Sequence, residues 1–187
     1  MRLIENSPIV FDDLVPDQLS KKIESTLLGP SFPWFYAGDV TYGPNPPSGV
    51  KDRNFGLVHT YVKEGGEVNS QYFDLVSAVF YLLIARIPWL ANHEVTKCRS
   101  FMQLPAGRST PNNKHTDGEY PHVVCLYYVS DSDGETVLYG PNEADGVSAK
   151  VKPKRGRVVV FDGKMYHASS NPANDTRTIV NFVLTEQ

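Results

Sequence analysis

The N-terminal part of the chain carries two stretches whose apolar residues recur at helical spacing. In the first, Leu19, Ile23 and Leu27 follow one another every four residues, Pro16 stands just before them, and Gly29-Pro30 comes directly after. Proline is favoured at the start of a helix, and a Gly-Pro pair ends one. The pattern therefore predicts an amphipathic helix that begins near Pro16 and ends at Gly29.

A second helix is predicted to begin near Asn69 or Ser70, and its apolar side is broad. The residues that form this side are Tyr72, Phe73, Leu75, Val76, Val79, Phe80 and Leu83. Such a wide apolar side suits packing against a sheet. Between the two helices, residues 36–56 are rich in Gly, Pro and Asn. This composition predicts a long loop, which is either a binding loop or an exposed connection.

From Glu94 onward, short runs of Val, Tyr, Phe and Leu alternate with turn residues. We expect strands at 95–104, 114–117, 122–129, 135–139, 148–152, 156–161, 165–168 and 177–185, in addition to a short strand at 9–11. About eight closely spaced strands in one half of a chain are typical of a sandwich or jelly roll. The predicted fold class is mainly β with flanking helices, which support one outer face.

Length and composition narrow the organisation further. A chain of 187 residues is long enough for one sizeable domain, so we expect a single domain over 1–187, with helical support at about 1–93 and a jelly-roll core at about 94–187. The 18 basic and 21 acidic residues leave a net charge of −3, which does not favour general nucleic-acid binding. No signal peptide or membrane span is evident, so we expect a soluble, cytoplasmic protein.

His115 and Asp117 are the first residues whose pattern indicates chemistry. Residues two apart on a strand point to the same face, so this imidazole and this carboxylate could bind one ion. His167, on a late predicted strand, is the best candidate for a third ligand. Two histidines and one carboxylate on one face of an ion are typical of non-haem Fe(II) oxygenases. The His-x-Asp pair alone is weak, because it also fits a polar edge strand.

Arg177 is the second candidate, ten residues beyond His167 at the start of an apolar strand. A charge in apolar surroundings is costly unless it is paired, and a guanidinium can hold a carboxylate through two parallel hydrogen bonds. Residue chemistry leaves two interpretations open. Arg177 is either a carboxylate-binding residue or an exposed side chain at a strand end, paired with Asp175 or with nothing.

Several short motifs also follow one another in a specific order. They are Ile9–Pro16 before a helix, His115-x-Asp117, Leu126–Val129, Asp133–Thr136, Val151–Pro153, Gly156–Phe161, Tyr166-His167 and Arg177. In this order the chain resembles the 2-oxoglutarate- and Fe(II)-dependent dioxygenases, nearest to their prolyl 4-hydroxylase-like branch. It departs from that branch at Asn113, where many prolyl hydroxylases have tyrosine, and at Arg177, where collagen-type members have lysine.

The resemblance implies a double-stranded β-helix, a cupin-like jelly-roll barrel, with Fe(II) held by His115, Asp117 and His167. It implies 2-oxoglutarate as cosubstrate, with its C5 carboxylate at Arg177, and hydroxylation with succinate and CO2 as coproducts. The family often uses a tyrosine on the strand after His-x-Asp, which makes Tyr128 a candidate second contact. Asn181 shares the strand parity of Arg177 and is a further candidate for the pocket.

Ascorbate is a candidate additional cofactor, and the oligomeric state is not predicted. The substrate is expected to be either a peptide or protein side chain, as in prolyl hydroxylation, or a small molecule. Two other functions remain open. A non-catalytic jelly-roll module that binds a ligand or partner would have no need for all four of His115, Asp117, His167 and Arg177. A zinc hydrolase or isomerase would use the triad but leave Arg177 without a role.

Overall fold

The structure is a computed structural model and describes residues 7–41, 54–107 and 110–187. Its helices are α1 (Asp17–Leu27), α2 (Phe73–Arg86) and the 3-10 helix η1 (Pro88–Asn92). Its strands are β1 (Ile9–Phe11), β2 (Phe35–Ala37), β3 (Gly56–Val62), β4 (His93–Gln103), β5 (Val123–Tyr128), β6 (Thr136–Tyr139), β7 (Val147–Val151), β8 (Val158–Asp162), β9 (His167–Ser169) and β10 (Arg177–Glu186).

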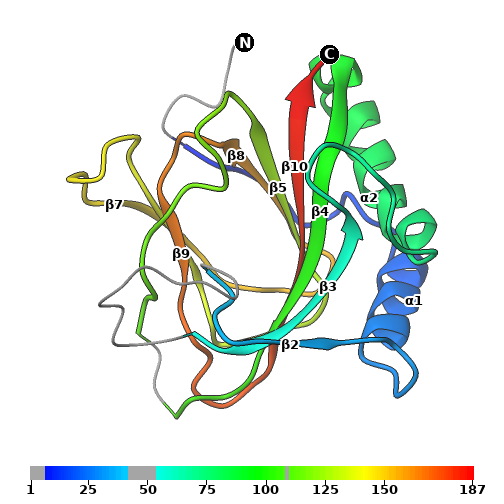
Figure 1. The fold of residues 1–187 in the computed structure, drawn as a ribbon, viewed down its shortest axis with the longest axis horizontal. Coiled ribbons are helices and arrows are strands. Elements are labelled where there is room, and N and C mark those ends of the chain that lie inside the picture. The colour runs from blue at the N-terminus through cyan, green and yellow to red at the C-terminus, as the bar shows by residue number, and fades with distance from the viewer. Residues whose placement is uncertain (1–6, 42–53, 108–109) are drawn as a thin grey trace.

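The strands form two antiparallel sheets. The larger sheet has the order β1-β8-β5-β10-β4-β3-β2, and the smaller has the order β7-β6-β9. Figure 1 shows the sheets on opposite sides of a barrel, with α1 and α2 together on the outer side of the larger sheet. The predicted fold class is therefore confirmed: it is mainly β, a double-stranded β-helix of the jelly-roll type, with helices on one outer face.

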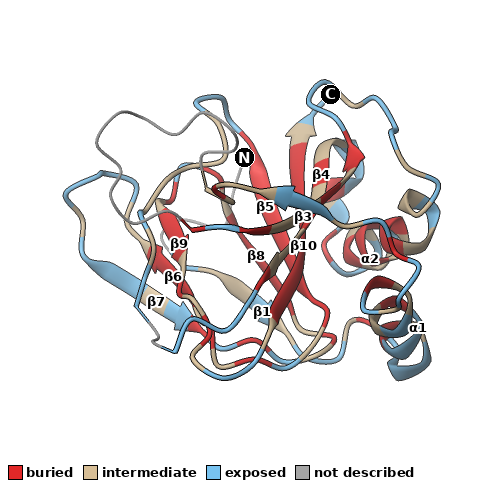
Figure 2. Ribbon diagram, turned by 60° about the horizontal axis from the view of Figure 1, so that its bottom comes forward, coloured by how far each residue is buried: buried red, intermediate tan, exposed pale blue. Residues whose placement is uncertain are grey.

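The helices and the larger sheet share one hydrophobic core. Helix α1 buries Ile23 and Leu27, and α2 buries Val76, Val79 and Leu83. The central strands β5 and β10 are buried on both faces, since one face meets the helices and the other lines the barrel (Figure 2). This double burial makes the central strands a rigid base on which side chains can be held inside the barrel.

The sequence-based assignment missed β2 and β3, so the N-terminal part is more than a helical support. Strand β3 pairs with β4, and β2 pairs with β3. The beginning of β3 looked like loop because of Gly56, but a Cβ there would lie 2.5 Å from the carbonyl oxygen of Met102. Glycine is thus required by close strand approach rather than by a turn. Residues 42–53 of the predicted loop lie outside the described residues.

No helix among the described residues is both long enough and apolar enough to cross a membrane.

Candidate metal centre

His115 and Asp117 lie in the segment before β5, and His167 is the first residue of β9. The strand expected at 114–117 is not formed, because only His115 pairs there, in an isolated antiparallel bridge with His167. In this bridge the backbone N–H of each histidine donates to the carbonyl oxygen of the other, over 3.0 and 2.9 Å. The imidazole centroids consequently lie 4.6 Å apart, although the residues are remote in sequence.

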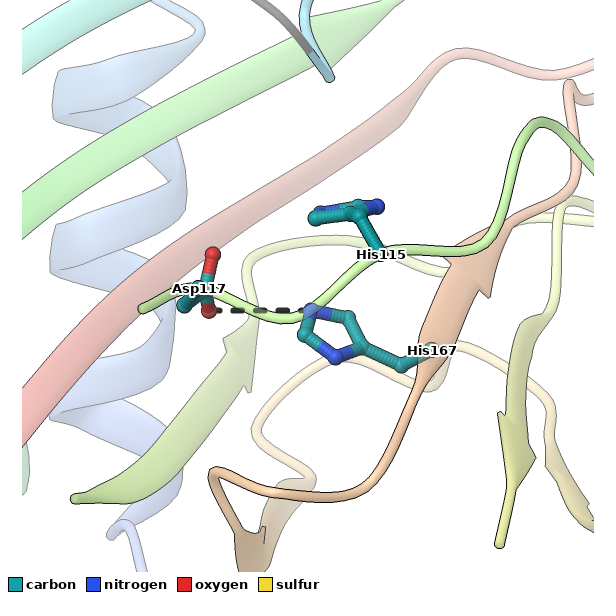
Figure 3. A group of neighbouring side chains, drawn as sticks. All are labelled: His115, Asp117 and His167. Atoms are coloured by element: carbon teal, nitrogen blue, oxygen red, sulfur yellow. Dashed lines mark ion pairs between the residues drawn. The ribbon is translucent and has the colours of Figure 1, made fainter. Parts of the chain in front are cut away.

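The structure brings the three predicted ligands together (Figure 3). One ligand atom from each of His115, Asp117 and His167 lies within 4.8 Å of the other two, and His167 Nε2 is 3.6 Å from Asp117 Oδ2. The Nδ1 atom of His115 faces the carbonyl oxygen of Asn113 at 3.3 Å, and that of His167 faces Met165 at 3.2 Å. An Nδ1–H that donates to a carbonyl leaves Nε2 free to bind a metal.

The protonation states of Asp117 and His167 suit the binding of a cation. Burial raises the pKa of the Asp117 carboxyl, but the imidazoles of His167 and His115 and a hydrogen bond from Asn181 lower it below its ordinary value. Burial lowers the pKa of His167 to about 4, although the Asp117 carboxylate opposes this shift. At neutral pH the centre therefore contains a carboxylate anion beside a neutral His167 imidazole, and these are the protonation states that bind divalent ions.

Asn181 is placed against the metal centre. Its Nδ2 donates to Asp117 Oδ2 over 2.9 Å, and it also lines the cavity described next. Its Oδ1 is buried without a hydrogen-bond partner among the described residues. Asn181 was a candidate for the pocket, with a cosubstrate contact that stays a prediction; in the structure it lines the cavity and its amide also orients the carboxylate of a predicted metal ligand, a role that second partners of metal ligands commonly have.

A cavity runs from the triad along the inner face of the larger sheet to Arg177. The residues that line it are Val40, Thr41, Arg99, Phe101, Gln103, His115, Asp117, Leu126, Thr136, His167, Ala168, Ser169, Arg177, Ile179 and Asn181. Arg177, Ile179 and Asn181 alternate along β10, so they share its inner face. Arg177 and Asn181 are four residues apart, which corresponds to roughly 13 Å along a strand. The cavity thus has a metal end and an arginine end.

Arg177 is 3% exposed, and its hydrogen bonds in the described part of the chain go only to neutral oxygens. Its Nε donates to Gly134 O over 3.1 Å, its Nη1 to Gln103 Oε1 over 3.0 Å, and its Nη2 to Thr136 Oγ1 over 2.7 Å. A guanidinium has about five N–H donors, and three contacts leave about two for a ligand. Arg177 is therefore buried, held in place and still uncompensated in charge. The alternative of an exposed strand-end arginine paired with Asp175 is excluded.

Thr136 and Tyr128 complete the arginine end. The Tyr128 hydroxyl donates to Thr136 Oγ1 over 2.6 Å, and the Arg177 guanidinium lies 5.8 Å from the centroid of the Tyr128 ring. Thr136 Oγ1 accepts from both Tyr128 and Arg177, which uses its two lone pairs. Its own hydroxyl proton is left to point at an acceptor, and Thr136 lines the cavity. Tyr128 supports this end through Thr136 and Arg177.

Two further residues hold Arg177, and the sequence analysis assigned no role to either. A Cβ on Gly134 would lie 3.1 Å from Arg177 Cδ and 2.8 Å from Ser170 O, so glycine makes room for the arginine. Gln103 pairs in register with Arg177 across β4 and β10. Gly134 and Thr136 lie in the Gly-Glu-Thr motif that supported the family resemblance, so that motif was the available signal. Gln103 had none, because its position depends on the strand register.

Comparison with known proteins defines the class of fold. No protein-family model matches the sequence, and no curated protein matches it. Among solved structures the chain has the fold of the 2-oxoglutarate and Fe(II) oxygenases. A 2OG-Fe(II) oxygenase family member from Burkholderia pseudomallei is 12% identical, with a TM-score of 0.70 over 96% of this chain and 85% of that one.

Two other solved structures with a similar fold are described as enzymes with different activities. A Trichoplax adhaerens prolyl hydroxylase in complex with a hypoxia inducible factor peptide fragment is 18% identical, with a TM-score of 0.68 over 97% of this chain and 84% of that one. The α-ketoglutarate-dependent carbocyclase SnoK from nogalamycin biosynthesis is 10% identical, with a TM-score of 0.65 over 96% and 79%. At such identities the similarity establishes the fold and leaves function to the site itself.

The residues of the metal centre fit a divalent ion of the Fe(II) type. Two imidazole nitrogens and one carboxylate oxygen form the donor set, and the free Nε2 of His167 faces Asp117. Both histidines have their other ring nitrogen hydrogen-bonded, and Asn181 fixes the carboxylate. Such secondary contacts are characteristic of metal ligands. No other group of three or more candidate ligands occurs in the described ranges.

Proposed function

We propose that this protein is an Fe(II)- and 2-oxoglutarate-dependent dioxygenase that hydroxylates its substrate and releases succinate and CO2. One observation carries the proposal. A single cavity has two histidines and an aspartate at one end and a buried, uncompensated arginine at the other. A divalent ion at the first end and a dicarboxylate between the two would satisfy both charges.

The protein residues have separate tasks in this proposal. Fe(II), when bound, would supply the chemistry of oxygen activation: O2 is the oxidant, 2-oxoglutarate and the substrate each give two electrons, and one oxygen atom goes to succinate and the other to the new hydroxyl. His115, Asp117 and His167 would occupy one face of the ion and leave the opposite face open. Asn181 would keep the carboxylate of Asp117 in position through its 2.9 Å hydrogen bond.

The arginine end would hold the C5 carboxylate of 2-oxoglutarate. Arg177 offers N–H donors that its three protein contacts do not use, and Thr136 offers its hydroxyl proton. Gln103 and Gly134 keep the guanidinium from rotating, so little side-chain entropy is lost when the carboxylate binds. The Tyr128 hydroxyl would act indirectly by fixing Thr136.

The proposed substrate is either a peptide or protein side chain or a small molecule. The prolyl hydroxylase from Trichoplax adhaerens was solved with a peptide, whereas SnoK belongs to the biosynthesis of nogalamycin. Ascorbate is included as a candidate cofactor, to be added in assays.

Anaerobic spectroscopy and succinate formation test the proposal. Purified protein with Fe(II) and 2-oxoglutarate should develop a weak visible charge-transfer band, and with oxygen and ascorbate it should convert some 2-oxoglutarate to succinate. His167→Ala should abolish both signals, because two remaining ligands cannot hold the ion and chelate. His93→Ala is the matched control, since His93 opens β4 and is outside the cavity.

The same experiment distinguishes the non-catalytic alternative. A jelly-roll binding module would show neither the band nor succinate, and His167→Ala would leave its ligand affinity unchanged. Absence of both signals in the wild-type protein, with correct folding verified by circular dichroism, would rule out the dioxygenase.

A further inference from the structure

Arg99 is a second cationic side chain on the inner face of the larger sheet, and the proposed reaction has no task for it. It lies on β4 directly opposite Asn181 of β10 and Thr60 of β3. Asn181 contacts the metal ligand Asp117, so the register places Arg99 at the level of the metal centre. Arg177 is two inward-facing positions deeper. Arg99 is thus beside the place where a substrate would have to approach.

The guanidinium of Arg99 has no ion-pair partner among the described residues. It stacks over the ring of Phe101, 5.0 Å from the ring centroid. Three groups with negative or ionisable oxygens influence it, namely Asp117, Glu64 and Tyr120. Asp117 already accepts from Asn181 and belongs to the metal triad, and Glu64 is an exposed partner of Lys97 at 3.5 Å. Within the described ranges, the positive charge of Arg99 therefore has no carboxylate of its own and is available to a ligand.

Arg99 also lies between two cavities and lines both of them. It lines the cavity of the metal centre and an adjoining groove on its outer side, and Val40 and Phe101 are shared in the same way. The other residues of the groove are Tyr36, Ala37, Gly38, Asp39, Val58 and Thr60. Tyr36 is 74% exposed. An exposed aromatic ring and aliphatic walls next to a stacked arginine form a site with one cationic and one apolar part.

We propose that Arg99 binds a carboxylate of the primary substrate, and that the groove around Tyr36, Val58 and Phe101 holds an apolar, ring-sized part of the same molecule. This inference rests on the proposed dioxygenase function and names the class of substrate. The guanidinium of Arg99 packs over the Phe101 ring, and its planar group of N–H donors suits two parallel hydrogen bonds to a carboxylate. The carboxylate would anchor the substrate beside the metal centre.

The carboxyl group among the groove residues, Asp39, does not contradict an anionic ligand. Asp39 is 1% exposed, and its oxygens accept from the backbone N–H groups of Thr41 and Asn54. Its charge is thus turned toward the backbone and away from the open groove. A bound divalent ion would offset the charge of Asp117, so the cavity mouth would carry a net positive charge.

The test uses the protein loaded with Mn(II) and N-oxalylglycine, an unreactive analogue of 2-oxoglutarate. Two pairs of probes carry a benzyl group with or without charge: 3-phenylpropionate against its amide, and N-acetylglycylphenylalanine against its amide. Binding is followed by the Mn(II)-induced relaxation of the probe protons in NMR, which also reports proximity to the ion. The first pair represents a small acid and the second a peptide C-terminus.

We expect at least one acid to bind near Mn(II) more tightly than its amide. Arg99→Gln should weaken that acid by about tenfold or more, which is typical of a lost charged hydrogen bond. Arg99→Lys should recover part of the affinity. Arg86→Gln is the matched control, because Arg86 also stacks on a phenylalanine, Phe11, but on the outside of the barrel. N-oxalylglycine affinity should change by no more than about twofold in all three variants.

Other results would overturn the inference. Equal binding of acids and amides would show that no cationic subsite exists. A loss of N-oxalylglycine affinity in Arg99→Gln as large as the loss for the acid would make Arg99 a cosubstrate residue. Failure of the wild-type protein to bind Mn(II) and N-oxalylglycine would end the proposed function and the inference with it, whereas normal loading without acid preference would end the inference alone.

Discussion

The metal end and the arginine end of the cavity are built in different ways. Arg177, Gln103 and Thr136 all lie on strands, and Arg177 makes three hydrogen bonds of 2.7–3.1 Å. His115 and Asp117 instead lie in an irregular segment. It is attached to β9 and the next residue by two isolated bridges, His115–His167 and Pro111–Ser170, and Asn112 N–H donates to Ser169 O over 2.8 Å. The arginine end is assembled by regular strands of the two sheets, whereas the metal end depends on isolated bridges and on the side chains themselves.

This difference indicates what each end still lacks. At the arginine end Arg177 already has its protein hydrogen bonds, but its positive charge has no counter-charge in the part of the chain that the structure describes, so this end is shaped to bind an anion. At the metal end the ligand atoms of a carboxylate and two imidazoles lie within 4.8 Å of one another, and a cation between them would accept their lone pairs. We therefore expect a substitution at the arginine end to lower the affinity for the cosubstrate analogue, and a substitution at the metal end to lower the affinity for the metal.

The largest effect is expected at the arginine end. Arg177→Met should lower the affinity for N-oxalylglycine about 100-fold, since two charged hydrogen bonds of roughly 1.5 kcal/mol or more each are lost. Arg177→Lys should lose less, because it keeps the charge but not the paired geometry. Calorimetric titration of the Mn(II)-loaded protein measures both affinities.

Mn(II) affinity in the absence of the analogue is the control for this comparison. It should stay within about twofold in Arg177→Met, because the two ends are roughly 13 Å apart along β10. A comparable loss of metal affinity would mean that the two ends are energetically coupled and do not bind their ligands independently.

Of the two ends of the cavity, only the metal end is expected to respond to mildly acidic pH. Burial lowers the pKa of His167 from 6.5 to about 4 in the folded protein. Between these values the unfolded chain binds a proton that the folded chain does not, so the free energy of unfolding falls as the pH falls. The slope for one such group approaches about 1.4 kcal/mol per pH unit. Urea unfolding of metal-free protein from pH 7 to 4 measures it.

His167→Gln should remove this part of the slope, while Arg177→Lys should leave it unchanged because both side chains stay charged over this range. The Asp117 carboxyl, whose pKa is lowered, stabilises the fold above its ordinary pKa and loses this effect only at lower pH. Parallel slopes for the wild-type protein and His167→Gln would contradict the assignment of the shift to His167.

The contrast between the two ends also explains what could be read from the sequence. The run of apolar residues located β10 correctly, because that signal is local, whereas the burial of Arg177 was one of two interpretations and only the structure decides it. A strand was also expected at 114–117, and that prediction was wrong, because an isolated bridge and not a strand aligns His115 with His167. Gln103 and Arg99 were not found, because their place at the cavity follows from the register between β4 and β10. Register depends on the whole sheet and is not visible in either strand alone.

The smallest effect is expected from a substitution of Asn181. Asn181 lies on β10 like Arg177, but its amide donates to Asp117 Oδ2 over 2.9 Å. Asn181→Ala should reduce Mn(II) affinity by about tenfold, the lower range for lost partners of metal ligands. N-oxalylglycine affinity at saturating Mn(II) should change little, since Arg177 and Thr136 are untouched. Electron paramagnetic resonance of free Mn(II) measures the first value and calorimetry the second. Should the cosubstrate analogue suffer more than the metal, Asn181 would belong to the arginine end after all, as strand parity alone had indicated.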